Sequence, residues 1–289
     1  MRRSPPLLQC IAAALLAATR LAQAQGAPAW CARPDTAGVE LRFLDVGQGD
    51  AALLVTSDGR HALIDGGPDA ALLDAYLTRD RIDRLDLVIV SHHHLDHIGG
   101  LPAVFASRTV TNVVENGMPA TTRIYGRLVD AMARRGSRVL AATARDLTLG
   151  TATVRILPPW RAAEDQNDAS VGVIVSHGAF RALFTGDAET RAIEAWIRDG
   201  RIPRVQVAKA GHHGSRNGVT PALVRAAAPA LLVISVGEAN RYRHPHPEAL
   251  AAWRAPSRRV LRTDLEGTIR VRGCADGRFF TTTAREGVR

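Results

Sequence analysis

Four histidines and one aspartate, all residue types that can bind metal, stand within a six-residue stretch of the sequence. His92, His94, Asp96 and His97 follow an apolar run, Leu85–Val90, that predicts a buried β-strand. Zinc and similar cations favour neutral imidazole and carboxylate ligands, and alternate residues of an extended loop can point the same way. The spacing predicts that His92 and His94 share one metal ion, while Asp96 and His97 turn towards a second. The alternative is a polar surface loop that binds metal adventitiously.

The His-x-His-x-Asp-His pattern at 92–97 resembles the signature of the metallo-β-lactamase superfamily of hydrolases. The resemblance implies an α/β fold, the αββα four-layer sandwich, with metal bound where the two sheets meet at their loop edge. A second motif, Leu44–Ala51 (LDVGQGDA), is similar to the opening of the metallo-hydrolase domain of the ComEC/Rec2 competence proteins. Two divalent metal ions, zinc or manganese, are the cofactors that these motifs imply.

Three aspartates lie in the glycine-rich turns of this opening region. Leu63–Gly67 matches the strand-end aspartate of the superfamily, which implies that Asp65 supports the metal loop without binding metal itself. Two glycines let the turn between Asp45 and Asp50 bend tightly, so both carboxylates could face the site. Local turn hydrogen bonds are the interpretation that we favour for Asp45 and Asp50.

A second group of ligand-type side chains follows two later strands. Asp187 ends an apolar strand, and the resemblance implies that it bridges two metal ions; the alternative is that it caps the helix that follows. The family places its last metal ligand within Gly211–Ser215. The sequence leaves open whether that ligand is His212 or His213, and the other histidine then contacts substrate or supports a ligand.

Lys209 and Ser215 flank this pair of histidines. Lys209 is the only lysine of the chain and is expected to face an anionic substrate, with a solvated strand end as the alternative. Ser215 could be read as a nucleophile, but a metal-activated water needs no serine. We therefore place both residues among those that bind substrate or support the ligands.

One motif departs from other branches of the superfamily. The β-lactamase, glyoxalase II and lactonase branches carry Gly-His-Thr/Ser where this chain has Asn167–Ser170 (NDAS), and the nearby His177 is expected in a hairpin turn. Asn167 and Ser170 are candidates for weak ligation, for positioning a metal-bound water, or for binding substrate. One fewer nitrogen donor softens the preference for zinc and makes an oxygen-richer, manganese-like site plausible. The competence-protein branch also has Asn-x-x-Ser here.

The segment Val236–Glu248 resembles the closing motif of the same branch. Asn240, Tyr242 and His244 are polar groups on a proline-rigid loop that could contact a phosphate, whereas His246 could cap the following helix. Eight of the ten histidines of the chain fall in this loop and the two loops described above. Random placement would not concentrate them in this way.

Short strands and helices are expected to position these loops within one hydrolase domain, residues 39–285, after a linker at 25–38. Period-two and apolar runs bounded by glycine predict strands, and longer segments with caps predict helices. The elements expected are strands Val39–Val46, Ala51–Thr56, His61–Asp65 and Arg204–Ala208, helices Asp69–Arg81 and Glu189–Arg198, a hairpin at 146–158, and terminal strands near 259–264, 266–273 and 278–284.

The first residues predict a secretory signal peptide at 1–24. Two arginines precede an apolar run, Leu7–Ala18, and Ala22–Ala24 offers a small-x-small cleavage site. The run is too short for a comfortable membrane span, so no stable span is expected after cleavage; an uncleaved anchor is the alternative. We expect a periplasmic or secreted protein. There, Cys31 and Cys274 could form a disulfide or remain two buried thiols.

The composition limits what can be said of partners. The chain carries a net charge of +9 from 37 basic residues, and all but one of these are arginine. An arginine-biased genome explains much of this basicity, so charge alone is weak evidence for a nucleic-acid partner. The oligomeric state is beyond the sequence.

The expected chemistry is hydrolysis by a metal-activated water. Asp96 would hold the nucleophile and accept its proton, and Asp187 would link the metals. Resemblance to the competence proteins and to teichoic-acid phosphorylcholine esterases favours a phosphodiester substrate, DNA included. The alternatives are a lactone, lactam or other ester hydrolase of the same fold, and a metal-containing module that binds DNA or another polymer without catalysis.

Overall fold

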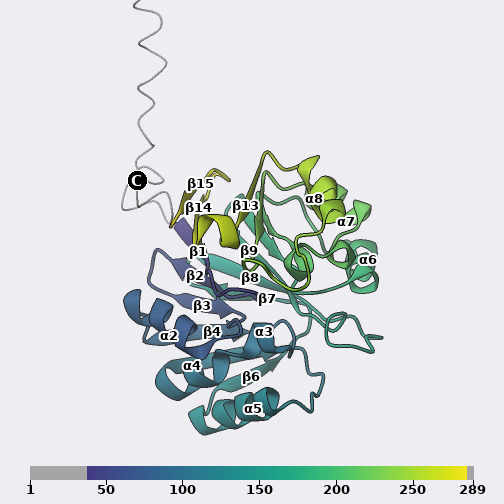
Figure 1. Cartoon of the computed structure of the whole chain (residues 1–289). Helices are drawn as coiled ribbons and strands as arrows, with labels where there is room; N and C mark the ends of the chain where they lie inside the picture. Colours follow the sequence, from purple (N-terminus) through teal and green to yellow (C-terminus); the bar gives the residue numbers. More distant parts are fainter. Residues whose placement is uncertain (1–37, 285–289) are drawn as a thin grey trace, which may run out of the picture. The chain divides into compact units, whose positions relative to one another are not determined.

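Two β-sheets lie face to face in the part of the chain that the structure, a computed structural model, describes: residues 38–284 (Figure 1). The eight-stranded sheet contains, in spatial order, β15 (Phe279–Thr283), β14 (Ile269–Cys274), β1 (Gly38–Phe43), β2 (Ala52–Thr56), β3 (His61–Ile64), β4 (Arg84–Ile89), β5 (Thr109–Glu115) and β6 (Arg138–Ala141). The seven-stranded sheet contains β13 (Arg259–Arg262), β12 (Leu231–Ile234), β11 (Val207–Lys209), β10 (Phe180–Phe184), β9 (Gly172–His177), β8 (Ala152–Leu157) and β7 (Arg145–Leu149).

Alternation along the strands divides the apolar side chains between the inner and outer faces of the sheets. On β2, Leu54 joins the core between the sheets, while Leu53 faces the helices outside. The inner core also contains Phe43 and Phe184, one from each sheet, whose stacked rings lie 5.5 Å apart. The two sheets are therefore held together by a continuous apolar layer.

Helices cover both outer faces, which confirms the αββα sandwich (Figure 1). The eight-stranded sheet is covered by α2 (Ala70–Arg79), α4 (Leu101–Ser107) and α5 (Arg123–Arg135). The seven-stranded sheet is covered by α6 (Thr190–Arg198), α7 (Pro221–Ala227) and α8 (Pro247–Arg254). Short turns of helix at α3 (Leu95–Ile98), η2 (Gly211–Gly214), η3 (Arg216–Gly218) and α9 (Thr263–Glu266) complete the elements.

Parallel strands bring the predicted motifs to one edge of each sheet. β3 and β4 are parallel, so Asp65 and the histidine loop follow neighbouring strand ends. β10 and β11 are also parallel, which places Asp187 beside the loop that carries His212 and His213. The carboxyl ends of parallel strands meet at one edge, where α/β proteins commonly bind ligands.

Several expected boundaries were wrong for local reasons. Asp96 and His97 lie on the helical turn α3, not on an extended loop. β1 ends at Phe43 because the chain then turns: the Val46 N–H donates to the Leu44 carbonyl oxygen (3.1 Å). β11 starts at Val207, three residues later than expected, because the Val205 N–H donates to Ala227 outside the sheet.

Two other predictions for histidines are also corrected. His246 occupies the N-cap position of α8 but makes no side-chain capping bond; its Nδ1 instead accepts the Arg216 N–H (3.1 Å). His177 is the last residue of β9 and not part of the hairpin turn. Its Nδ1 lies 2.8 Å from the Thr151 carbonyl oxygen, at the opposite end of the strand from the histidine loops.

The remaining predictions concern the two ends of the chain and the disulfide. The signal peptide at 1–24, Cys31 and all but the last residue of the linker at 25–38 lie outside the described residues. Cys274, the last residue of β14, is disulfide-bonded. No helix within 38–284 has the length and apolar character needed to cross a membrane.

Candidate metal centre

Asp65 anchors the histidine loop to the end of the neighbouring strand. Its Oδ1 accepts the Ser91 N–H, and its Oδ2 accepts the Ser91 hydroxyl (2.7 Å each). The same Oδ2 lies 2.8 Å from Nδ1 of His97, so the other ring nitrogen, Nε2, is directed away from Asp65. A carboxylate that holds one imidazole nitrogen fixes the orientation and tautomer of a metal-binding histidine.

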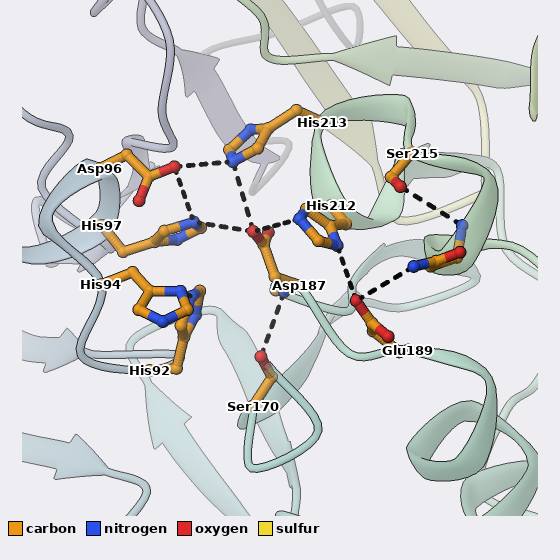
Figure 2. A network of polar contacts seen from close by, with 12 residues as sticks. His92, His94, Asp96, His97, Ser170, Asp187, Glu189, His212, His213 and Ser215 are labelled. Carbon is orange, nitrogen blue, oxygen red and sulfur yellow. Dashed lines mark hydrogen bonds and ion pairs between the residues drawn. The ribbon is translucent and has the colours of Figure 1, made fainter. Parts of the chain in front are cut away.

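Four side chains from both sheets converge next to this loop (Figure 2). The ligand-type atoms of Asp96, His97, Asp187 and His213 all lie within 4.8 Å of one another. Asp187 is central: its Oδ2 lies 3.3 Å from Nε2 of His97 and 3.4 Å from Nε2 of His213. His213 Nε2 also lies 3.3 Å from Oδ2 of Asp96.

His92 and His94 lie beside this cluster. Nε2 of His92 is 3.1 Å from Nδ1 of His94, and the rings of His92 and His97 have centroids 4.1 Å apart. His92 is fully buried, whereas His94 is exposed. The pair therefore connects the buried cluster to the solvent side of the site.

The unsatisfied atoms of the cluster fit a divalent cation. Nε2 of His97, Nε2 of His213 and Oδ1 of Asp187 are buried and form no hydrogen bond. Buried polar atoms are normally paired, so several unpaired nitrogen and oxygen ligands in one place need an explanation. Imidazole nitrogens with carboxylate oxygens are the ligand set of zinc and of manganese-like ions. The residues present fit the implied metal.

The electrostatics of the cluster lead to the same ligand set. Burial raises the pKa of Asp187, but the charges of His213 and His97 outweigh burial and hold that pKa well below its usual range. Burial lowers the pKa values of His97 and His213, but Asp187 outweighs it and raises both. Burial and His97 together lower the pKa of His92, which keeps its ring neutral, as a metal ligand requires. Protons on His97 and His213 would balance the negative charge of Asp187 here, and a bound cation would supply that positive charge instead.

The structure separates the roles of the two adjacent histidines. His213 contributes Nε2 to the cluster, and its Nδ1 lies 3.1 Å from the Ser235 carbonyl oxygen. His212 lies further out, with Nε2 3.7 Å from Asp187 and Nδ1 3.4 Å from Glu189. Both histidines have left-handed backbone conformations (φ +48° and +52°), which L-residues adopt at a cost. This turn aims the His213 ring into the centre.

Lys209 and Asp50 correct the sequence interpretation. Lys209 is buried and its Nζ bonds to Asp50 Oδ2, so it neither faces substrate nor ends a solvated strand. The Asp50 carboxylate is not used in a local turn: its Oδ1 lies 3.2 Å from Nδ1 of His213. Burial raises the pKa of Asp50, but Lys209 and His213 outweigh it and lower that pKa to about 2. The Asp50–Lys209 pair therefore contacts His213 at Nδ1, the ring nitrogen that does not face the cluster.

Three other predicted residues support the backbone. Ser170 Oγ accepts the Asp187 N–H (3.1 Å). Ser215 Oγ accepts the Asn217 N–H (3.3 Å) at the start of η3. Asn240 donates to the carbonyl oxygens of Gly237 and His244. Its side chain therefore holds its own loop together and is not directed at a phosphate, which corrects the expectation.

A cavity of about 390 Å³ opens onto the cluster. Asn167, Tyr242 and His244 line it as expected, and Oδ1 of Asn167 is buried without a hydrogen bond. Sequence reasoning missed two lining residues, Gln48 and Leu95; the glycines around Gln48 were the available signal. The lining residues are Gln48, His94, Leu95, Asp96, Asn167, Asp187, His212, His213, Tyr242 and His244.

Replacing Asp65 with asparagine should weaken metal binding by roughly 10- to 100-fold, the usual cost of losing a carboxylate behind a ligating histidine. Asparagine tolerates the left-handed backbone of this position (φ +57°), so the change tests the carboxylate and not the turn. Competition with a chromogenic chelator measures the affinity. An unchanged affinity would show that Asp65 does not orient His97.

Comparisons with known proteins agree with this geometry. The family model described as the Metallo-beta-lactamase superfamily matches residues 44–238. The chain is 27% identical over 81% of its length to ComE operon protein 3 of Bacillus subtilis (strain 168), and 32% identical over 78% of its length to competence protein ComA of Neisseria gonorrhoeae. It spans 33% and 31% of those two proteins. The fold is similar to that of the metallo-beta-lactamase fold protein YhfI of Bacillus subtilis (TM-score 0.55, 14% identity, 85% of this chain and 100% of that chain).

Proposed function

Since this chain belongs to the metallo-beta-lactamase superfamily, we propose that it is a metal-dependent phosphodiesterase that acts outside the cytoplasm. The observation that carries the proposal is the convergence of Asp96, His97, Asp187 and His213 beneath an open cavity. Three of these side chains are almost completely buried, and Asp96 keeps 30% of its side chain exposed towards that cavity. The centre therefore has a protected ligand set and one carboxylate that substrate and water can reach.

The ligand positions suggest two metal sites that share one carboxylate. Asp96, His97 and His213 would hold one ion, His92 and His94 the other, and Asp187 would contact both. When bound, such ions lower the pKa of a water and polarise the phosphoryl oxygen. Asp65 and Ser170 position His97 and Asp187 respectively through the hydrogen bonds described above.

Asp96 is the residue placed to handle the proton of the attacking water. Burial raises its pKa, but the neighbouring His213 and His97 outweigh burial and lower the pKa to about 2, so the carboxylate is ionised at neutral pH. It lines the cavity and lies 3.3 Å from His213. An ionised carboxylate within reach of the nucleophile can accept its proton during the attack.

The cavity favours a phosphodiester. His212 and Tyr242 can each donate a hydrogen bond to an anionic oxygen from its walls. The volume of about 390 Å³ suits a phosphate group with its two substituents. Asn167 stands where the lactonase and β-lactamase branches carry histidine, and the resemblance to competence proteins points to DNA or another phosphodiester polymer. Residues 1–24 support a periplasmic or secreted location.

Hydrolysis of bis-p-nitrophenyl phosphate by the protein tests this function. We expect turnover with manganese or zinc, loss of turnover after chelation, and recovery when the metal is returned. A simple lactone serves as the comparison substrate and should be hydrolysed poorly, because its ester lacks the charge that the cavity donors bind.

Two results would contradict the proposal in different ways. Hydrolysis of the lactone without hydrolysis of the phosphodiester would favour the ester-hydrolase alternative. Stoichiometric metal binding with no turnover of either substrate would favour a binding module.

A further inference from the structure

A basic groove runs along the edge of the seven-stranded sheet, outside the metal centre. Two hollows of about 470 and 450 Å³ adjoin there and share Asp199 and Arg201 in their walls. We call them together the arginine groove. Its charged and aromatic lining consists of Arg145, Asp146, Arg155, Trp160, Arg161, Trp196, Arg198, Asp199 and Arg201.

The positive charge of the arginine groove is only partly neutralised. Arg155 pairs with Asp146 (2.7 Å), and Arg201 pairs with Asp199 (3.0 Å). Arg161 and Arg198 are exposed and, within residues 38–284, form no ion pair. Five arginines thus face two aspartates, which leaves a surplus of positive charge in a concave surface. Concave surfaces of one charge concentrate oppositely charged ligands.

Trp160 adds an aromatic surface on a firmly held wall. Its ring is half-buried against the core beneath α6, and its carbonyl oxygen accepts the Ala163 N–H (3.1 Å). Next to it, the Pro158 carbonyl oxygen accepts Nε1 of Trp196 (2.7 Å). Grooves that combine arginine with an aromatic platform are typical of single-stranded nucleic-acid binding, because bases stack on the ring while phosphates contact the cations.

Two segments lead from the metal centre into the arginine groove. Asn167, in the cavity wall, lies six positions after Arg161, and even a fully extended chain of that length spans only about 20 Å. Helix α6 runs from the N-cap Glu189, which contacts His212, to Arg198, a distance of about 14 Å at 1.5 Å per residue. The arginines therefore lie within reach of a polymer whose scissile bond is at the centre.

We propose that the arginine groove binds single-stranded nucleic acid, holding the part of the strand that continues beyond the metal centre. This inference rests on the proposed function, since it places the scissile phosphodiester in the cavity. A gap of 14 to 20 Å corresponds to about 4–6 nucleotides at the 3.4 Å spacing of a duplex strand, and to fewer in an extended strand. Small phosphodiesters would not reach the groove.

Fluorescence anisotropy with the metal-loaded protein tests the proposal. The probe is a labelled single-stranded DNA of about twelve nucleotides with phosphorothioate linkages, which resist hydrolysis and span the distance to the groove. Arg161→Glu combined with Arg198→Glu should weaken binding by roughly tenfold or more and lower the salt slope of log K by about 1.4, the value for two phosphate contacts on a single strand. Trp160→Ala should weaken binding roughly fivefold or more.

The matched control reverses two arginines outside the groove, on a helix that covers the eight-stranded sheet. Arg127 and Arg134 on α5 are also exposed and have no ion pair within the described residues. Arg127→Glu with Arg134→Glu changes the net charge by the same amount, so it should leave affinity nearly unchanged if the groove is the binding site. Equal weakening by both double variants would overturn the proposal, as would unchanged affinity in the groove variant.

Two further measurements identify the occupant and separate this proposal from the function itself. Heparin that binds as tightly as the oligonucleotide, with no effect of Trp160→Ala on either ligand, would overturn the nucleic-acid assignment. Hydrolysis of bis-p-nitrophenyl phosphate should be the same in wild type and in the groove variant. Absence of that hydrolysis in wild type would contradict the proposed function, whereas the binding comparison would still decide whether the groove holds nucleic acid.

Discussion

Replacing Lys209 with methionine is expected to destabilise the folded protein by about 3–5 kcal/mol, the usual cost of removing one partner of a buried ion pair. Lys209 and Asp50 are 4% and 5% exposed, and the ammonium group bonds directly to the carboxylate. Methionine has a similar length but no charge, so the Asp50 carboxylate would remain buried without its main partner. Equilibrium unfolding in urea, followed by circular dichroism, measures the change.

The double variant Asp50→Asn, Lys209→Met is the control for this prediction. It removes both charges, so it should recover a large part of the stability lost in the single variant. Asp50 also lies 3.2 Å from His213, and the double variant should therefore bind metal less tightly even where it folds well. A single variant within 1 kcal/mol of wild type would show that the Asp50 charge is solvated or neutralised by other groups.

Asp187→Asn is expected to lower the rate of phosphodiester hydrolysis by at least roughly 10³-fold. Several kcal/mol of charge stabilisation depend on a bound metal, and each 1.36 kcal/mol corresponds to a factor of ten in rate. Asp187 is the carboxylate that contacts both His97 and His213, and the amide keeps its shape while removing its charge. Metal content after dialysis and turnover of bis-p-nitrophenyl phosphate should fall together.

Asp276→Asn is the matched control for Asp187→Asn. Asp276 is an exposed carboxylate that pairs with Arg278 in the turn between β14 and β15, away from the cluster. It should change neither metal content nor turnover. If Asp187→Asn kept its metal and more than a tenth of its activity, Asp187 would not be a central ligand.

Local sequence patterns carried much of the fold. The N-cap at Asp69 predicts the start of α2, and in the structure Oδ1 of Asp69 accepts the Leu72 N–H. The helix expected at 189–198 matches α6, Thr190–Arg198, to within one residue. The His-x-His-x-Asp-His spacing predicts the candidate metal loop because its ligand-type side chains are close in sequence. In such cases, neighbouring residues are enough to predict the site.

Contacts between distant residues were not predictable from local patterns. Asp50 and Lys209 are 159 positions apart, and their pairing depends on how the two sheets are aligned. Gln48 lines the cavity because Gly49 allows its loop to approach Asp96, whose carbonyl oxygen would lie 2.3 Å from a Cβ at that glycine. The sequence does not show such close approaches.

The choice between His212 and His213 illustrates the same limit. In a regular strand, neighbouring side chains point to opposite sides, so only one of the two could face the metal. The left-handed turn at both residues decides which one does, and sequence alone does not specify those backbone angles. Polar residues on loops, such as Asn240, were similarly ambiguous, because holding a loop and binding a ligand need the same chemical groups.

The candidate metal centre would draw its ligands from both halves of the sandwich, and this would couple metal binding to folding. Asp96 and His97 follow β4 of one sheet, whereas Asp187 and His213 follow β10 and β11 of the other. An ion held by all four side chains binds only when the halves are assembled, so mass action favours the assembled state. At a free ion concentration of 100 times Kd, this linkage contributes about 2.7 kcal/mol. The concentration of free metal around the protein would thus set the stability of the folded state as well as its catalytic activity.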